Sequence, residues 1–77
     1  MTIQVEFTGP MRRPWPERSR ALEVGEGMLL AELLRSFGYS EDEAKVLSCS
    51  INGATVRLRA PLHDGDRVLV TLLLGGG

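Results

Sequence analysis

A chain of 77 residues is long enough for one small domain and too short to enclose a large active-site cavity. Apolar residues make up 43% of it and charged residues 25%, which argues against a disordered polymer. This small size favours a carrier, adaptor or small subunit. The formal net charge of −1 lacks the basic surplus needed to bind nucleic acid through phosphates.

The first half of the chain predicts two strands joined by a loop. Thr2 to Thr8 alternates between apolar and polar residues, which is typical of a half-buried strand. Gly9-Pro10 ends this strand, and a loop with Pro14-Trp15-Pro16 leads into a second strand, predicted over Ser19 to Val24.

A helical period follows. Met28 to Phe37 carries apolar residues three, four and eight positions apart, which predicts a helix of roughly 15 Å. Gly38 is suited to ending this helix. Ser40 followed by Glu43 matches the capping-box pattern and predicts a short helical turn through Lys45.

The second half of the chain predicts three strands. They cover Val46 to Ile51, Thr55 to Leu58 after an Asn52-Gly53 turn, and Arg67 to Leu74. Since the last strand is almost entirely apolar, we expect it in the middle of the sheet, beside the first strand.

This order of elements predicts a β-grasp fold, an α+β domain with a mixed sheet of four to five strands and one main helix on one face. We expect the domain to cover residues 1–74 and a flexible glycine tail to cover residues 75–77. The predicted core contacts of the helix are Leu30, Leu33 and Phe37. If Val68, Val70 and Leu72 face the helix, then Leu69, Thr71 and Leu73 face away from it, and these three are our predicted partner-binding residues.

The tail of Gly75, Gly76 and Gly77 is the most informative feature. An inert linker or a cloning remnant is one interpretation. The functional interpretation is a thin arm that ends in a carboxylate and enters a channel too narrow for any side chain. Attack of the Gly77 carboxylate on ATP would form an acyl adenylate, which a sulfur or amine nucleophile can then resolve.

Several motifs together resemble one family. Val5 to Arg13 is similar to the start of MoaD, the small subunit of molybdopterin synthase. Ile51-Asn52-Gly53, the turn from Leu62 to Val68 and the Gly-Gly end are similar to both MoaD and the thiamine sulfur carrier ThiS. The chain therefore resembles the MoaD/ThiS family of ubiquitin-like sulfur carriers over its whole length.

The resemblance implies a function. A ubiquitin-activating-type enzyme would adenylate Gly77 with ATP and Mg²⁺, and sulfur from a persulfide would convert it to a thiocarboxylate. The expected acceptor partner is a molybdopterin synthase large subunit or a thiazole synthase. The chain itself would bind no cofactor or metal and would be a carrier rather than an enzyme, because its partners supply the catalytic groups.

The departures from the family leave the pathway open. MoaD proteins commonly carry two prolines and a small residue before the final Gly-Gly, whereas this chain has Leu72 to Leu74 and a third glycine, as in some ThiS proteins. The long first loop is unlike ThiS. Molybdopterin, thiamine and tRNA-thiolation branches remain, as does a ubiquitin-like protein modifier or interaction module. The single lysine, Lys45, offers few sites for self-conjugation and favours the carrier.

The remaining candidates have simpler interpretations. Cys49 is expected to be a small core residue, and the single cysteine excludes an internal disulfide. His63, Asp64 and Asp66 are expected to form a turn rather than a metal site. Trp15 would pack on the sheet or contact a partner. Arg12, Arg13, Arg18 and Arg20 would form either a solvated loop or a docking patch for an acidic partner.

The sequence also predicts the compartment. The first residues lack the basic region and apolar run of a secretory signal, and no apolar stretch approaches the roughly 20 residues that cross a bilayer. We therefore expect a cytoplasmic protein without a membrane partner.

Overall fold

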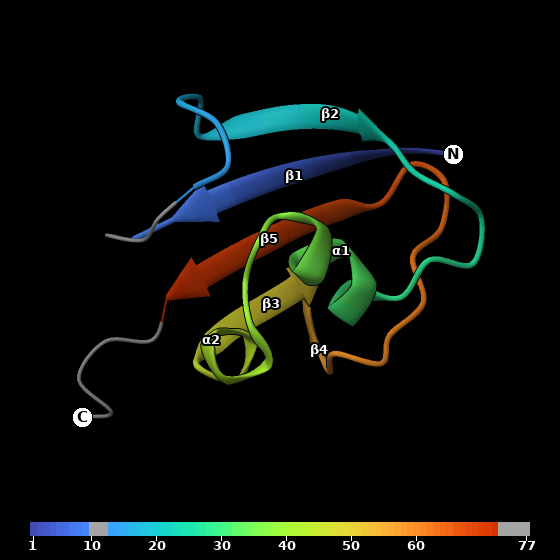
Figure 1. Ribbon diagram of the computed structural model, residues 1–77. Coiled ribbons are helices and arrows are strands. Elements are labelled where there is room, and N and C mark those ends of the chain that lie inside the picture. The colour runs from blue at the N-terminus through green and yellow to red at the C-terminus, as the bar shows by residue number, and fades with distance from the viewer. Residues whose placement is uncertain (10–12, 73–77) are drawn as a thin grey trace.

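The computed structural model describes residues 1–9 and 13–72. Its seven elements are β1 (Thr2–Thr8), β2 (Ser19–Glu23), α1 (Leu30–Ser36), α2 (Glu41–Lys45), β3 (Leu47–Ile51), β4 (Ala54–Val56) and β5 (Arg67–Leu72). The strands form one mixed sheet in the order β2-β1-β5-β3-β4, and both helices lie against the same face (Figure 1). This arrangement confirms the predicted β-grasp fold.

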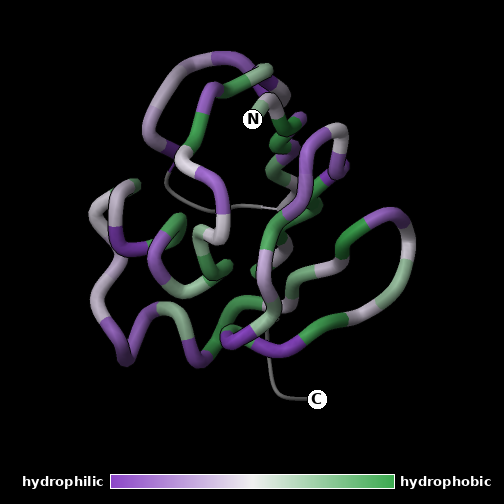
Figure 2. The backbone as a smooth tube through the Cα atoms, turned by 90° about the vertical axis from the view of Figure 1, so that its right-hand side faces the viewer, coloured by the Kyte–Doolittle hydropathy of each residue, from purple (hydrophilic) through white to green (hydrophobic). Residues whose placement is uncertain are grey.

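β5 lies in the middle of the sheet, parallel to β1 and antiparallel to β3. Its position confirms the expectation from its apolar composition, because a central strand is contacted on both edges and at least one face. Val68 and Val70 point toward the helices and are 1% and 0% exposed. Figure 2 shows hydrophobic (green) and hydrophilic (purple) stretches following one another along the backbone.

The core lies between α1 and the sheet. Leu30, Leu33 and Leu34 of α1 are all fully buried. They belong to one apolar cluster with the inward residues of the two central strands, Ile3, Val5, Phe7, Val68 and Val70. Phe37 is half-buried rather than buried, because it follows the last turn of α1 and its ring lies at the edge of the core.

The first helix is shorter than predicted. It begins at Leu30 rather than Met28, because the Met28 carbonyl accepts a hydrogen bond from the backbone N–H of Leu62 (2.8 Å) and Leu29 pairs with Pro61 as an isolated bridge. The chain before the helix therefore runs beside the segment that leads into β5. α1 ends as expected, since Gly38 has a left-handed φ of 93°.

The predicted capping box is also present at the second helix. The Ser40 hydroxyl accepts a hydrogen bond from the Glu43 backbone N–H (3.1 Å), and the Glu43 carboxylate accepts one from the Ser40 backbone N–H (2.9 Å). These two bonds satisfy donors that a helix start otherwise leaves free. β4 ends at Val56 instead of continuing to Leu58, whose carbonyl accepts a hydrogen bond from Ala31 at the start of α1 (2.8 Å).

Candidate functional site

The base of the predicted reactive tail is the end of β5. Gly75, Gly76, Gly77 and the predicted contact residue Leu73 lie outside the described residues, as does the predicted domain boundary after residue 74. Leu72, the last described residue, pairs with Leu47 of β3. On the other side, a Cβ atom built on Gly9 would stand 3.8 Å from the backbone nitrogen and oxygen of Leu72. The chain segment that leads into the tail is therefore held between two neighbours.

Leu69 and Thr71 lie on the sheet face that the helices leave uncovered, as predicted. Both are half-buried, whereas Val68 and Val70 of the same strand are buried in the core. The residues that flank Leu69 on the neighbouring strands are Glu6 and Ser50. Thr71 is flanked by Thr8 and Ser48, and the hydroxyl oxygens of Thr8 and Thr71 are 2.7 Å apart.

A shallow hollow of about 590 Å³ opens on this face around Leu69. Its lining is Gln4, Glu6, Thr8, Ser19, Ser50, Asn52, Gly53, Arg67, Val68 and Leu69. The Val68 side chain faces the core, so Leu69 supplies the large apolar side chain among these described residues. An apolar centre inside a polar ring is the arrangement that protein interfaces use for their strongest contacts. The open face is thus more polar than the predicted contact residues Leu69, Thr71 and Leu73 suggest.

At the opposite end of β5, Asp66 joins two turns. This carboxylate is 6% exposed. One oxygen accepts a hydrogen bond from the Asn52 side-chain nitrogen (2.9 Å) and the other from the His63 backbone N–H (2.8 Å). The Asn52 side-chain oxygen accepts from the backbone N–H of Arg67 (2.9 Å). Asp66 is therefore a buried tie between the β3–β4 turn and the turn before β5, which the sequence interpretation as a simple turn residue missed.

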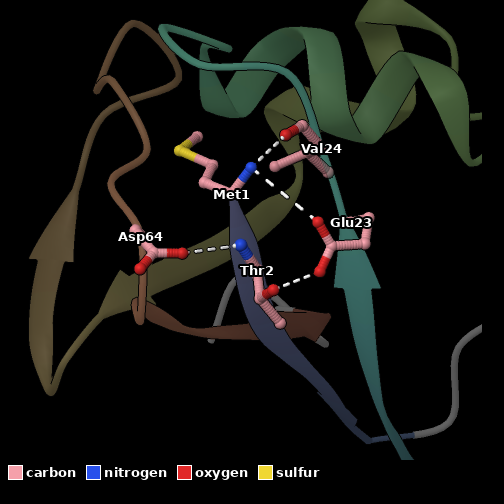
Figure 3. Close-up of polar contacts among 5 residues, drawn as sticks. All are labelled: Met1, Thr2, Glu23, Val24 and Asp64. Atoms are coloured by element: carbon pink, nitrogen blue, oxygen red, sulfur yellow. Dashed lines mark hydrogen bonds and ion pairs between the residues drawn. The ribbon is translucent and has the colours of Figure 1, made fainter.

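The other members of this turn also have structural partners. Asp64 accepts a hydrogen bond from the backbone N–H of Thr2 (2.8 Å), as Figure 3 shows. The His63 Nδ1 atom is 3.8 Å from the nearer Asp66 carboxylate oxygen. In residues 1–9 and 13–72, no three His, Cys, Asp or Glu side chains lie close enough together to hold a metal ion.

Cys49 is a core residue, as predicted. Its side chain is 4% exposed on the helix-facing side of β3. Burial raises the pKa of its thiol from 9.0 to about 11, because the apolar surroundings disfavour the thiolate. At neutral pH the group is a protonated thiol, which is a poor nucleophile and a poor relay for sulfur.

Trp15 packs back on the domain, which confirms the first of the two interpretations of this residue. Its ring forms edge-to-face contacts with Phe7 and Phe37 at centroid distances of 5.5 and 5.3 Å. The Arg20 guanidinium stacks on the outer side of the indole, 4.8 Å from the ring centre. The sequence placed Trp15 between two prolines but carried no signal for its partner Arg20, which is five residues away.

Comparison with known proteins identifies the family. The family description that matches this chain is the ThiS family, and the match covers residues 5–77. The chain belongs to the ThiS family. No curated protein matches it in sequence. In the described part of this ThiS-family chain, no helix is long and apolar enough to cross a membrane.

Solved structures share the fold of this chain. SAMP1 from Haloferax volcanii has a TM-score of 0.78 at 12% identity, with full coverage of both chains. A complex of subunits 1 and 2 of molybdopterin-converting factor from Helicobacter pylori has a TM-score of 0.66 at 25% identity, again with full coverage of both chains. A Pyrococcus furiosus protein described as a putative molybdopterin converting factor subunit 1 has a TM-score of 0.74 at 21% identity. The match covers 95% of this chain and 98% of that chain. The chain is thus a member of the ubiquitin-fold sulfur carrier family.

Proposed function

We propose that this protein carries sulfur on its C-terminal Gly77 as a thiocarboxylate and donates it in the biosynthesis of a cofactor, molybdopterin or the thiazole of thiamine. The observation that carries the proposal is the family match, which runs through residue 77 and so includes the glycine tail. The fold is consistent with it, because the central strand β5 ends at Leu72, three residues before Gly75 in the sequence.

The chemistry needs only the terminal carboxylate of this chain. A carboxylate oxygen of Gly77 attacks the α-phosphorus of ATP on the adenylating partner, and pyrophosphate leaves with the help of Mg²⁺. A persulfide sulfur then displaces AMP from the acyl carbon, and a thiol cleaves the sulfur–sulfur bond to leave the thiocarboxylate. The partners bind ATP and Mg²⁺ and supply all catalytic side chains. Gly75 and Gly76 serve because they carry no side chain that would block a narrow channel.

The open sheet face is our proposed docking surface for these partners. Leu69 is its apolar centre, and Thr71 lies next to it toward the end of β5. Leu73, which we also propose as a contact residue, lies outside the described residues. The Helicobacter pylori relative was solved as a complex of its two subunits, which supports a large-subunit partner for this chain as well. A thiazole synthase is the corresponding partner in the thiamine branch.

A protein modifier is the second candidate, favoured by the likeness to SAMP1, a small archaeal modifier protein. Both functions begin with adenylation of Gly77 and then differ in the nucleophile, which is sulfur for the carrier and a target amine for the modifier. The single lysine, Lys45, is exposed on α2 and limits chain formation between copies. We therefore place the carrier first.

The experiment is ATP–pyrophosphate exchange by the cognate adenylating enzyme. Deletion of Gly77 moves the carboxylate by about 3.5 Å, and one added alanine moves it outward by the same length, so both changes should abolish exchange. Gly76→Ala should also lower it strongly, whereas the control Gly25→Ala, where a Cβ meets nothing within 4 Å, should not. All four variants should keep the wild-type melting temperature. Normal exchange by both the deletion and the extension would show that the terminal carboxylate is not the reactive group.

A further inference from the structure

The loop between β1 and β2 lies at the end of the sheet where the tail begins. Figure 1 shows this loop, in light blue, at the same end as the arrowhead of β5. The backbone N–H of Phe7 donates to the Arg18 carbonyl (2.8 Å), and Phe7 is in register with Val70 of β5. Arg18 therefore stands two strands from β5, about 10 Å away, at the level of Val70, two residues before the end of β5.

The described part of this loop is fixed on the core by Trp15. The ring of Trp15 is wedged against Phe7 and Phe37, and Arg20 covers it from outside. Arg20 in turn forms an ion pair with Glu17 (2.8 Å). A loop held in this way loses little backbone entropy when a partner binds it, so the backbone that carries Arg18 is already in place.

The three described arginines of the loop have different roles. The Arg20 guanidinium is occupied by Trp15 and Glu17. Arg13 and Arg18 are exposed, and within residues 1–9 and 13–72 their side chains form no hydrogen bond or ion pair. The fourth arginine, Arg12, lies outside the described residues. Arg20 is thus a structural clamp, while Arg13 and Arg18 are available to a partner.

We propose that Arg13 and Arg18 form a basic contact beside the exit of β5, which binds an acidic surface at the mouth of the channel that receives the tail in the adenylating enzyme. This proposal rests on the carrier function proposed above and adds a second point of attachment to the open sheet face. Any enzyme that takes in the tail must approach this end of the sheet. A second contact, made by this fixed loop, would set the orientation of the carrier on the enzyme. Charged groups at an interface rim act mainly through association rate and salt dependence.

The test compares two double charge reversals. Arg13→Glu with Arg18→Glu changes the proposed contact, and Arg57→Glu with Arg59→Glu changes two exposed arginines in the segment after β4, with the same change in net charge. Binding to the adenylating enzyme is measured by titration without ATP, and exchange is measured separately. Because all four side chains are exposed, both double variants should keep the wild-type melting temperature.

We expect the Arg13/Arg18 variant to raise the Kd about tenfold at low ionic strength, with the ratio falling toward one at high salt. The exchange reaction should show the same factor in KM and an unchanged kcat. The Arg57/Arg59 variant should match the wild type. An equal loss of affinity in both double variants would mean that only the net charge matters. Unchanged affinity in both would mean that Arg13 and Arg18 do not contact the enzyme. Either result overturns the proposal. Wild-type exchange is measured alongside. Its absence would show that Gly77 is not adenylated and would contradict the proposed function, independent of the binding result.

Discussion

The two ends of the sheet are built in different ways. Where β1 begins, the ends of neighbouring segments are joined by hydrogen bonds (Figure 3). The Met1 ammonium donates to the Val24 carbonyl (2.9 Å), and the Thr2 backbone is bonded to Asp64 and to Gly65 (both 2.8 Å). Where β5 ends, the adjoining loop is held by the edge-to-face packing of Trp15 and by the Arg20–Glu17 ion pair, and Arg13 and Arg18 are exposed.

This contrast separates stability from recognition. At the end where β1 begins, hydrogen bonds join the turns to the strands. The buried Asp66 carboxylate, which accepts from Asn52, connects the β3–β4 turn to the turn before β5 and so stabilises the position of β5. At the end where β5 stops, charged residues of the loop can be substituted without unfolding the sheet, because β5 is already paired with β1 and β3. Changes at the first end should therefore alter folding, and changes at the tail end should alter partner binding.

The largest expected effect is on the core that both ends share. Leu33→Ala should lower the free energy of unfolding by about 2–5 kcal/mol, because Leu33 is fully buried between α1 and the sheet. The measurement is chemical denaturation, with Arg35→Ala on the exposed side of the same helix as the control. A loss of unfolding free energy below about 1 kcal/mol would contradict the burial of Leu33 between α1 and the sheet.

Asp66→Ala tests the polar end directly. The change leaves the Asn52 side chain and the His63 N–H without their acceptor, so we expect a loss of about 1–3 kcal/mol. Asp64→Ala removes an exposed carboxylate and should cost less, which makes it the matched control. At a temperature where it is folded, the Asp66 variant should support wild-type exchange. A defect in exchange with unchanged stability would reverse the roles of the two ends.

Leu69 tests the open face. Leu69→Glu is unsuitable because it would place a second carboxylate opposite Glu6 on the neighbouring strand. Leu69→Thr keeps a residue that favours strands and removes the apolar centre of the hollow. We expect about tenfold weaker binding to the adenylating enzyme and little change in stability. Thr55→Ser on the edge strand β4 is the control, and equal affinity of both variants would remove Leu69 from the docking surface.

The smallest expected effect concerns Cys49 and appears only at high pH. Its folded pKa of about 11 lies above the ordinary value of 9.0, so the unfolded chain releases a proton that the folded chain keeps. The stability from the neutral buried thiol is therefore complete below pH 9.0 and is lost as the pH rises toward about 11. Denaturation over this range should show a steeper decline for the wild type than for Cys49→Ala. Parallel declines would contradict the burial of the thiol.

Much of the fold follows from local sequence patterns. The alternation in β1, the apolar stripe of α1 and the capping box at Ser40 are local features, and the structure confirms all three. The position of β5 followed from its composition. The start of α1 was predicted two residues early, because the bond from Leu62 to Met28 joins segments far apart in the sequence.

The same limit applies to the candidate site. Alternation alone was enough to place Leu69 and Thr71 on the open face. It did not reveal the bond from Asn52 to Asp66 or the stacking of Arg20 on Trp15, because both depend on how turns and strands meet in space. Buried polar contacts of this kind become visible only once the strand register is known.

The most direct test of the carrier function is the intact mass of the protein after co-expression with its cognate adenylating enzyme and a sulfur donor. We predict a gain equal to the exchange of one oxygen for one sulfur, located on Gly77 by fragmentation and lost when Gly77 is deleted. A modifier would instead give a series of heavier conjugates to other proteins. An unchanged mass, or only such conjugates, would contradict the assignment of this chain as a sulfur carrier.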